Sequence, residues 1–166
     1  MVIATTILED IKLALADVND PEIPAISIVD LGIVHEVVVD GGSGAIRVEL
    51  LPTFVGCPAL DAIREAVERR LAAFGRPVDV RFVFSVPWTT DRITLAGHDA
   101  LRRSGVAPPT GTAAVGSPLV VLESPVPCPF CGSTRTRLEN VFGPAQCRSI
   151  RYCLSCRQPF EQFKEI

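Results

Sequence analysis

The amino-acid sequence predicts an α+β fold, a small mixed β-sheet with packed helices, followed by a separate cysteine-rich domain at the C-terminus. Over the first hundred residues, the spacing of apolar residues alternates between helical and strand periods in the order α-β-β-α-β-α. Hydrophobic residues make up 48% and charged residues 21% of the 166-residue chain, which is typical of a globular protein. All but one of the six cysteines follow residue 124, which indicates two domains of different chemistry.

The first three elements are a helix and a β-hairpin. Apolar residues recur at helical spacing over residues 7–17 and predict a helix there. Residues 33–39 and 45–51 are rich in β-branched residues that alternate with polar ones, so they predict two strands. The glycine-rich segment 40–44 between these strands is typical of a hairpin connection.

A second helix, a third strand and a third helix complete the first domain. An apolar stripe predicts a helix over residues 58–74, and Gly75 is placed to end it. Alternating valines and phenylalanines predict a strand over 78–84. A short helix is expected over 87–104, and Gly105 follows it.

The predicted domain boundaries are 1–109 for the α+β domain and 128–166 for the cysteine-rich domain. Residues 110–127 predict a flexible linker, because the charge-free stretch 104–118 is rich in proline, glycine, serine and threonine. The alternative is an ordered arm that lies over the first domain, which so many prolines would allow.

Four cysteines of the C-terminal domain form two C-x-x-C pairs, Cys128 with Cys131 and Cys153 with Cys156. Two residues between thiolates allow both to bind one ion. Four thiolates complete a closed tetrahedron around Zn²⁺ with no open position. The spacing therefore predicts one structural zinc ion.

The residues between the two pairs predict the hairpin of a zinc ribbon, with strands over 134–138 and 148–152. A domain of this size buries little core, so the ion is expected to supply most of its folding free energy. Mononuclear iron or an iron–sulfur cluster also uses four thiolates and stays an alternative. Disulfides are less favoured, because nothing in the sequence indicates export. The remaining Cys147 is interpreted as a small buried side chain rather than a further ligand.

Charge divides along the chain as unevenly as cysteine does. Residues 1–124 carry ten basic and sixteen acidic residues, whereas residues 125–166 carry six basic and three acidic ones. The acidic domain argues against a nucleic-acid groove, and the basic ribbon is suited to an acidic partner surface. The longest stretch without charge, 104–122, contains prolines and glycines that exclude a membrane-spanning helix. No secretory signal is visible, so a cytoplasmic protein is expected.

The lone cysteine of the first domain, Cys57, lies between Gly56 and Pro58 at the predicted start of the second helix. Backbone N–H groups and the helix dipole at that position favour a thiolate, so we expect a lowered thiol pKa and a high metal affinity. The alternative is a buried cysteine beside a helix end. One thiolate per chain cannot hold an iron–sulfur cluster, so a carrier would need a dimer, a second ligand type or transient binding.

Two other residue types could act with this thiol. A Cys57 nucleophile would need a base, and His35 and His98 are the two histidines of the chain. Asp20, Glu22 and Asp30 flank predicted turns and could offer oxygen ligands to iron. Hydrogen bonding within turns is the favoured interpretation of Asp20 and Asp30.

Several segments carry a family likeness: Asp-Pro-Glu-Ile-Pro at 20–24, Asp-Leu-Gly-Ile at 30–33, Pro-Thr-Phe-Val-Gly-Cys-Pro at 52–58, Trp-Thr-Thr-Asp at 88–91, Gly-Val-Ala-Pro-Pro at 105–109, and the tail Pro-Phe-Glu-Gln-Phe-Lys at 159–164. The first three resemble the metal–sulfur-cluster assembly family typified by SufT. Together, in this order, they resemble the PaaD (PaaJ) family, small components encoded with the phenylacetyl-CoA epoxidase, or ring 1,2-monooxygenase, of aerobic phenylacetate degradation.

The resemblance implies a non-catalytic accessory component that helps to mature the epoxidase by delivering iron or an iron–sulfur unit. Ring chemistry would belong to a di-iron oxygenase subunit fed by a flavin and iron–sulfur reductase, and both would be partners of this chain, which could also form a homodimer. Cys57 matches the single motif cysteine, expected to contact iron or an iron–sulfur unit transiently. The ribbon cysteines match the family's ligands and Cys147 a further tail cysteine, whereas Glu165 stands where the family usually has cysteine.

Two other functions stay open from the sequence. The chain could be a purely structural subunit of the oxygenase complex, for which Cys57 would be dispensable. It could also be a thiol-dependent enzyme that uses Cys57, although no base, phosphate loop or dinucleotide fingerprint is readable.

Overall fold

The computed structural model describes residues 2–111 and 125–165, with side chains from residue 7 onward in these ranges. Contacts divide the chain into two compact units, Met1–Trp88 and Thr89–Ile166. Each unit has its own β-sheet. In the described ranges, every helix is too short or too polar to cross a membrane.

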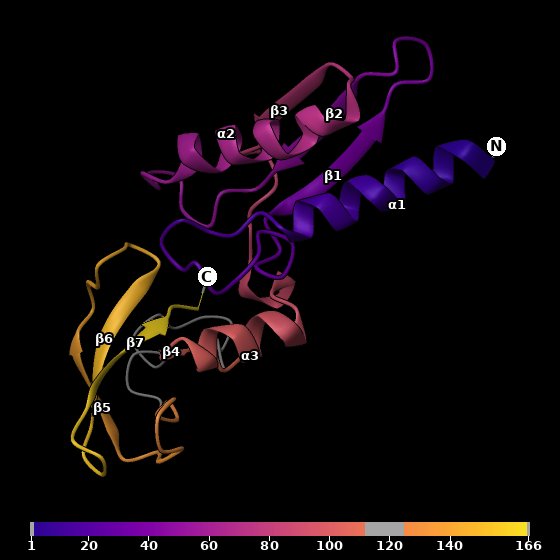
Figure 1. The fold of residues 1–166 in the computed structure, drawn as a ribbon. Helices are drawn as coiled ribbons and strands as arrows, with labels where there is room; N and C mark the ends of the chain where they lie inside the picture. The colour runs from indigo at the N-terminus through magenta and orange to yellow at the C-terminus, as the bar shows by residue number, and fades with distance from the viewer. Residues whose placement is uncertain (1, 112–124, 166) are drawn as a thin grey trace. The chain divides into compact units, whose positions relative to one another are not determined.

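Unit 1 is a three-stranded sheet with two helices (Figure 1). Its sheet order is β1-β2-β3, with β1 antiparallel and β3 parallel to β2. Helix α1 contacts β1 and α2, and helix α2 contacts β3. The elements are α1 (Val2–Ala16), β1 (Val34–Val39), β2 (Ile46–Leu50), α2 (Leu60–Leu71) with a 3-10 turn (Ala72–Phe74), and β3 (Val78–Phe82).

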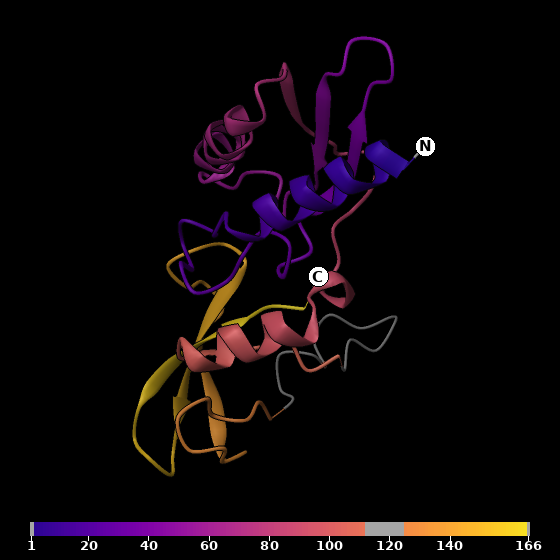
Figure 2. The ribbon, with the colours of Figure 1, turned by 45° about the vertical axis from the view of Figure 1, so that its right-hand side comes forward.

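The core of unit 1 follows from the apolar spacing of its sequence. Alternate residues of β2 are fully buried, and so is one stripe on each helix, as the periods of strand and helix require. These buried residues are Ile46, Val48 and Leu50 on the strand, Ile11 and Leu15 on α1, and Ile63, Val67 and Leu71 on α2. Figure 2 shows α1 lying across the β1–β2 hairpin. The predicted α+β fold is confirmed.

Two helix starts differ from the predicted ones. Helix α1 begins at Val2, before the predicted start at residue 7. Helix α2 begins at Leu60, because Pro58 and Ala59 form a turn ahead of it. Gly75 ends the following 3-10 turn in the left-handed conformation, with φ of 64°, which glycine adopts without steric cost.

The loop between α1 and β1 is fixed by side-chain hydrogen bonds. The Asp20 carboxylate accepts hydrogen bonds from the backbone N–H groups of Glu22 and Ile23, at 2.8 and 2.9 Å. The Trp88 indole N–H donates to the carbonyl oxygen of Leu31, at 3.0 Å. Trp88 is 3% exposed, so it belongs to the core of unit 1.

The described part of unit 2, residues 89–111 and 125–165, pairs one helix with a four-stranded sheet of order β4-β7-β6-β5 (Figure 2). Thr94 caps the helix, since its hydroxyl oxygen accepts a hydrogen bond from the N–H of Gly97. The elements are a 3-10 turn (Thr90–Arg92), α3 (Leu95–Arg103), β4 (Val106–Ala107), β5 (Thr136–Asn140), β6 (Arg148–Cys153) and β7 (Pro159–Phe163). The antiparallel β5–β6 pair is the predicted ribbon hairpin.

The boundary between the units differs from the predicted domain boundary at residue 109. Strand β4 pairs in parallel with β7, and α3 contacts β4, so residues 89–109 belong to the ribbon unit. The predicted linker 110–127 is described at its two ends, and residues 112–124 lie outside the described part of the chain. At the far end of that segment, Val126 is 1% exposed and lies in the core of unit 2.

Candidate metal centre and the Cys57 loop

The four cysteines of the two C-x-x-C pairs lie together in unit 2. Their Sγ atoms all lie within 4.8 Å of one another. Across the two pairs, Cys128 lies 3.7 Å from Cys156 and Cys131 lies 3.6 Å from Cys153, measured between Sγ atoms. A tetrahedron with metal–sulfur bonds of about 2.3 Å has edges of about 3.8 Å. The arrangement of sulfurs therefore fits a four-coordinate zinc ion.

Each pair of cysteines is held by a tight backbone turn. The N–H of Gly132 donates to the carbonyl oxygen of Cys128, and the N–H of Arg157 donates to that of Cys153. Gly132 and Arg157 both have positive φ, 73° and 61°, which turns the chain around the sulfurs. Arg157 adopts this conformation despite its side chain, which indicates that the surrounding fold imposes it.

Backbone donors are aimed at the sulfurs of the second pair. The N–H of Cys156, together with that of Ser155, lowers the pKa of Cys153 to about 6. Desolvation and the neighbouring sulfurs raise the pKa of Cys156 to about 12. Amides that stabilise a thiolate also orient and polarise a metal ligand, so the donor set suits a tetrathiolate zinc site.

Cys147 lies apart from this cluster. It is 8% exposed, and its carbonyl oxygen accepts a hydrogen bond from the N–H of Lys164, at 2.9 Å. Among the described residues, the group of ligand atoms around the cluster does not include its sulfur. The interpretation of Cys147 as a small buried side chain fits this position.

Cys57 lies in the loop between β2 and α2. Its N–H donates to the carbonyl oxygen of Phe54, at 3.1 Å, and its side chain is half-buried. The two residues after Thr53, Phe54 and Val55, are 40% and 75% exposed. The thiol therefore lies beside an exposed apolar turn, a feature that residue type alone did not predict.

The environment of Cys57 opposes ionisation of its thiol. Burial raises the pKa of Cys57, the N–H of Ala59 opposes this effect, and the carboxylates of Glu22 and Asp20 raise the pKa further. The pKa of Cys57 is thus raised, not lowered as expected, because burial of the thiol and the carboxylates of Glu22 and Asp20 outweigh the N–H of Ala59.

The three acids singled out by the sequence divide into two groups. Glu22 and Asp20 act on the Cys57 sulfur, and Asp20 also accepts the turn hydrogen bonds described above. Asp30 accepts a hydrogen bond from the Ser27 hydroxyl, at 2.9 Å, and its N–H donates back to that oxygen. The predicted turn role is thus present for both aspartates, and Glu22 with Asp20 also makes the surroundings of the thiol acidic.

No histidine is among the groups that act on the Cys57 thiol in the described part of the chain. The groups that shift the pKa of Cys57 include no imidazole. His35 lines a cavity of about 390 Å³ in unit 1 with Lys12 and Glu36, and His98 lies on α3 in unit 2. The described residues of unit 1 thus give the Cys57 thiol no imidazole partner.

The ribbon exposes fewer basic side chains to solvent than its sequence contains. Arg151 is 2% exposed and donates through Nε to the Gln162 Oε1, and its burial lowers the guanidinium pKa. Arg148 is buried in an ion pair with Glu161, at 2.6 Å. These two arginines serve the fold of the sheet rather than an exposed basic face.

The fold and the site define a two-part protein, in which an α+β unit with a loop cysteine is joined to a ribbon unit with a four-cysteine metal centre. Residues 8–81 match a family model described as an iron-sulfur cluster assembly protein, and residues 116–164 match the PaaD zinc beta ribbon domain. The chain is 36% identical over 165 residues to an Escherichia coli (strain K12) protein named as one subunit of a "Putative 1,2-phenylacetyl-CoA epoxidase", covering 99% of this chain and 96% of that protein. The chain belongs to the PaaD family.

Solved structures resemble the first unit. A domain of unknown function (DUF59) from Bacillus anthracis is 27% identical, with a TM-score of 0.52, and the likeness covers 56% of this chain and 89% of that one. A conserved hypothetical protein from Thermotoga maritima is also 27% identical, with a TM-score of 0.48 over 55% of this chain and 89% of that one. The likeness to the first of these supports the α+β fold.

Proposed function

We propose that this chain is a non-catalytic maturation component of a phenylacetyl-CoA 1,2-epoxidase in aerobic phenylacetate degradation. In this proposal Cys57 contacts iron or an iron–sulfur unit in transit to the oxygenase or the reductase of that system. The whole-length relative that is named as a subunit of such an epoxidase supports the assignment to this system. The family match of residues 8–81 to an iron-sulfur cluster assembly protein supports the delivery role.

The surroundings of Cys57 carry this proposal. The carboxylates of Glu22 and Asp20 disfavour a thiolate because they place negative potential at the sulfur. The same potential favours a cation, and a ferrous ion that displaces the thiol proton would meet one sulfur and nearby carboxylate oxygens. A single half-buried thiol gives an incomplete ligand set, which suits cargo that must be released to a client.

The ribbon cysteines have a different role in this proposal. Cys128, Cys131, Cys153 and Cys156 would hold one zinc ion, which supplies folding free energy and performs no reaction. The four sulfurs fill a tetrahedron, so they leave no position for substrate or water. In this proposal the zinc ion stabilises the ribbon, whose surface binds a partner, and the Cys57 loop of unit 1 binds the iron or iron–sulfur unit that is delivered.

What surrounds the thiol supports a non-catalytic role. A cysteine nucleophile needs a base or a depressed pKa, whereas the pKa of Cys57 is raised by burial and by the two acids. Delivery of a metal does not need a thiolate before the metal arrives, because the metal itself displaces the proton.

Complementation of a deletion strain tests the proposal. The strain carries the Cys57→Ser chain, and growth on phenylacetate is measured together with iron and acid-labile sulfide in the purified epoxidase subunits. We expect lost growth and iron-poor clients, while the variant still copurifies with them. The matched control is Cys147→Ser, which removes a thiol outside both sites and should restore growth. Full restoration of growth and client metal by Cys57→Ser would instead support a structural subunit without metal transfer.

A further inference from the structure

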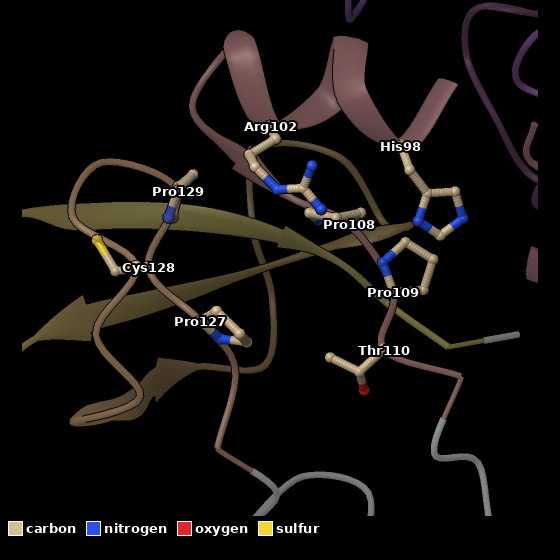
Figure 3. Close-up of a pocket in the computed structure, with 9 residues that line it drawn as sticks. His98, Arg102, Pro108, Pro109, Thr110, Pro127, Cys128 and Pro129 are labelled. Atoms are coloured by element: carbon tan, nitrogen blue, oxygen red, sulfur yellow. The ribbon is translucent and has the colours of Figure 1, made fainter. Parts of the chain in front are cut away.

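Unit 2 contains a cavity of about 430 Å³ beside the first cysteine pair (Figure 3). Four prolines form much of its wall, two after β4 and two on either side of Cys128. They are Pro108, Pro109, Pro127 and Pro129. Volumes of this size hold a small ligand or one to two side chains, and rigid proline rings keep such a site open before binding.

Two polar side chains of α3 complete the cavity. His98 and Arg102 are one helical turn apart and therefore lie on the same face of the helix. In Figure 3 both side chains extend from the helix toward Pro108 and Pro109. Arg102 donates to Asp99 at 2.7 Å, and this pair leaves other guanidinium donors available. Among the described residues, the His98 imidazole has no hydrogen-bond partner, so it can serve a ligand.

Apolar side chains next to the cavity remain exposed to solvent. Leu95 precedes His98 by one turn of α3 and is 88% exposed. Phe130, between the first two cysteines, is 58% exposed, and its ring lies against Gly105. These side chains extend the apolar surface beyond the cavity. A bound protein segment would cover that surface, whereas a small anion would leave it exposed.

Charge favours an acidic partner at this site. Arg102 lines the cavity, and Arg102 and Arg103 end helix α3. The side chain of Arg102 is 53% exposed, so a carboxylate can reach it from solvent. The rings of the lining prolines and of Phe130 can provide apolar contact around a carboxylate that binds Arg102.

We propose that this cavity is a docking site for a segment of a partner protein in which an acidic side chain stands between aromatic residues. The carboxylate binds between Arg102 and His98, and the neighbouring aromatic side chains pack on the prolines and on Phe130. This docking does not depend on metal transfer by Cys57, which lies in the other unit.

Peptide titration of the full zinc-loaded chain tests the proposal. The probes are acetyl-Phe-Asp-Phe-amide and acetyl-Phe-Asn-Phe-amide, which differ in charge but hardly in size. Amide shifts of Arg102, Thr110 and Gly132 in ¹⁵N spectra report binding at the cavity. We expect the aspartate peptide to bind about fivefold tighter than the asparagine peptide. This ratio corresponds to the free energy of one exposed ion pair. Equal affinity for the two peptides would overturn the proposal.

Matched variants assign the effect to the cavity. Arg102→Gln should abolish the preference for aspartate, whereas Arg103→Gln, the same change one residue on and outside the lining, should keep it. Asp99→Asn removes the competing carboxylate and should tighten aspartate binding by about twofold to threefold. Zinc content and dispersed spectra establish that each variant is folded. Acetate or benzoate binding as tightly as the aspartate peptide would show a small-anion site and refute protein docking.

Discussion

The Sγ atoms of Cys128 and Cys156 lie 3.7 Å apart, although the two residues belong to different cysteine pairs. Cys128 is also part of the buried core of unit 2, with Val126, Cys153 and Phe160. The metal centre and the apolar core of the ribbon are therefore one structure. An ion that joins the two pairs would fix the packing of β6 and β7 at the same time.

Loss of one ribbon ligand should unfold unit 2. Cys128→Ser leaves three sulfurs, so we expect loss of the zinc ion and of amide protection in β5 and β6. Zinc analysis and hydrogen exchange of the full chain measure both effects. Cys147→Ser is the control and should keep the metal, since its sulfur lies outside the cluster. A folded ribbon in zinc-free Cys128→Ser protein would contradict the structural role.

The thiol of Cys57 should react slowly at neutral pH. Burial and the carboxylates of Glu22 and Asp20 raise its pKa above the ordinary value of 9.0, and alkylation requires the thiolate. The rate of alkylation by iodoacetamide should therefore rise to half its maximum above pH 9.0. Mass spectrometry of the Cys57 peptide follows the rate in the zinc-loaded chain.

Removal of one nearby charge should shift that profile in a defined direction. Glu22→Gln removes an effect that raises the thiol pKa, so the midpoint should fall and the rate at pH 8 should increase. Glu36→Gln removes a carboxylate from exposed positions of β1 and serves as the control. An unchanged midpoint in Glu22→Gln protein would mean that Glu22 does not act on the sulfur.

Trp88 should stabilise unit 1 through its indole N–H. Trp88→Phe leaves the Leu31 carbonyl oxygen without this donor and removes part of a buried ring, so the free energy of unfolding should fall by about 1 to 3 kcal/mol. Thermal unfolding followed by circular dichroism measures the change. Val86→Ala, at a residue 36% exposed, should change stability by less than about 0.5 kcal/mol. Equal effects of the two substitutions would contradict a core role for Trp88.

Glu165 should hold the end of the described segment 89–111. Its carboxylate accepts hydrogen bonds from the N–H groups of Thr110 and Gly111 and from the hydroxyl of Thr90. Glu165→Ala should speed hydrogen exchange at the amides of Thr110 and Gly111 by about tenfold. This factor corresponds to the free energy that a charge-assisted hydrogen bond contributes. Zinc content should not change. Glu139→Ala, at an exposed ion pair with Arg137, should leave that exchange as it is.

Local pattern predicted the helices, the strands of unit 1 and the β5–β6 hairpin of unit 2. The alternation over 45–51 and the helical stripe over 58–74 match β2 and α2, because burial on one face follows directly from those periods. The spacing of the cysteines likewise predicted the cluster, since two C-x-x-C turns can share one ion. Glu165 departs from the family pattern in the sequence, but its contacts with Thr110 and Gly111 were not predictable.

Features that depend on distant segments could not be predicted. Strand β4 is two residues long and pairs with β7, which begins at a proline, so neither had a readable period. Phe84 continued the alternation of the third strand, yet β3 ends at Phe82 and Phe84 is 57% exposed. The raised pKa of Cys57 arises from burial and from acids more than thirty positions away in the chain.

The most direct measurement is metal and sulfide analysis, with an absorption spectrum, of protein purified without air and then offered ferrous iron. We expect one zinc ion per chain that Cys57→Ser protein retains, and additional iron that Cys57→Ser protein does not bind. The Glu22→Gln chain should bind that iron more weakly. Iron binding that is identical with and without the Cys57 thiol would contradict a cargo site in unit 1.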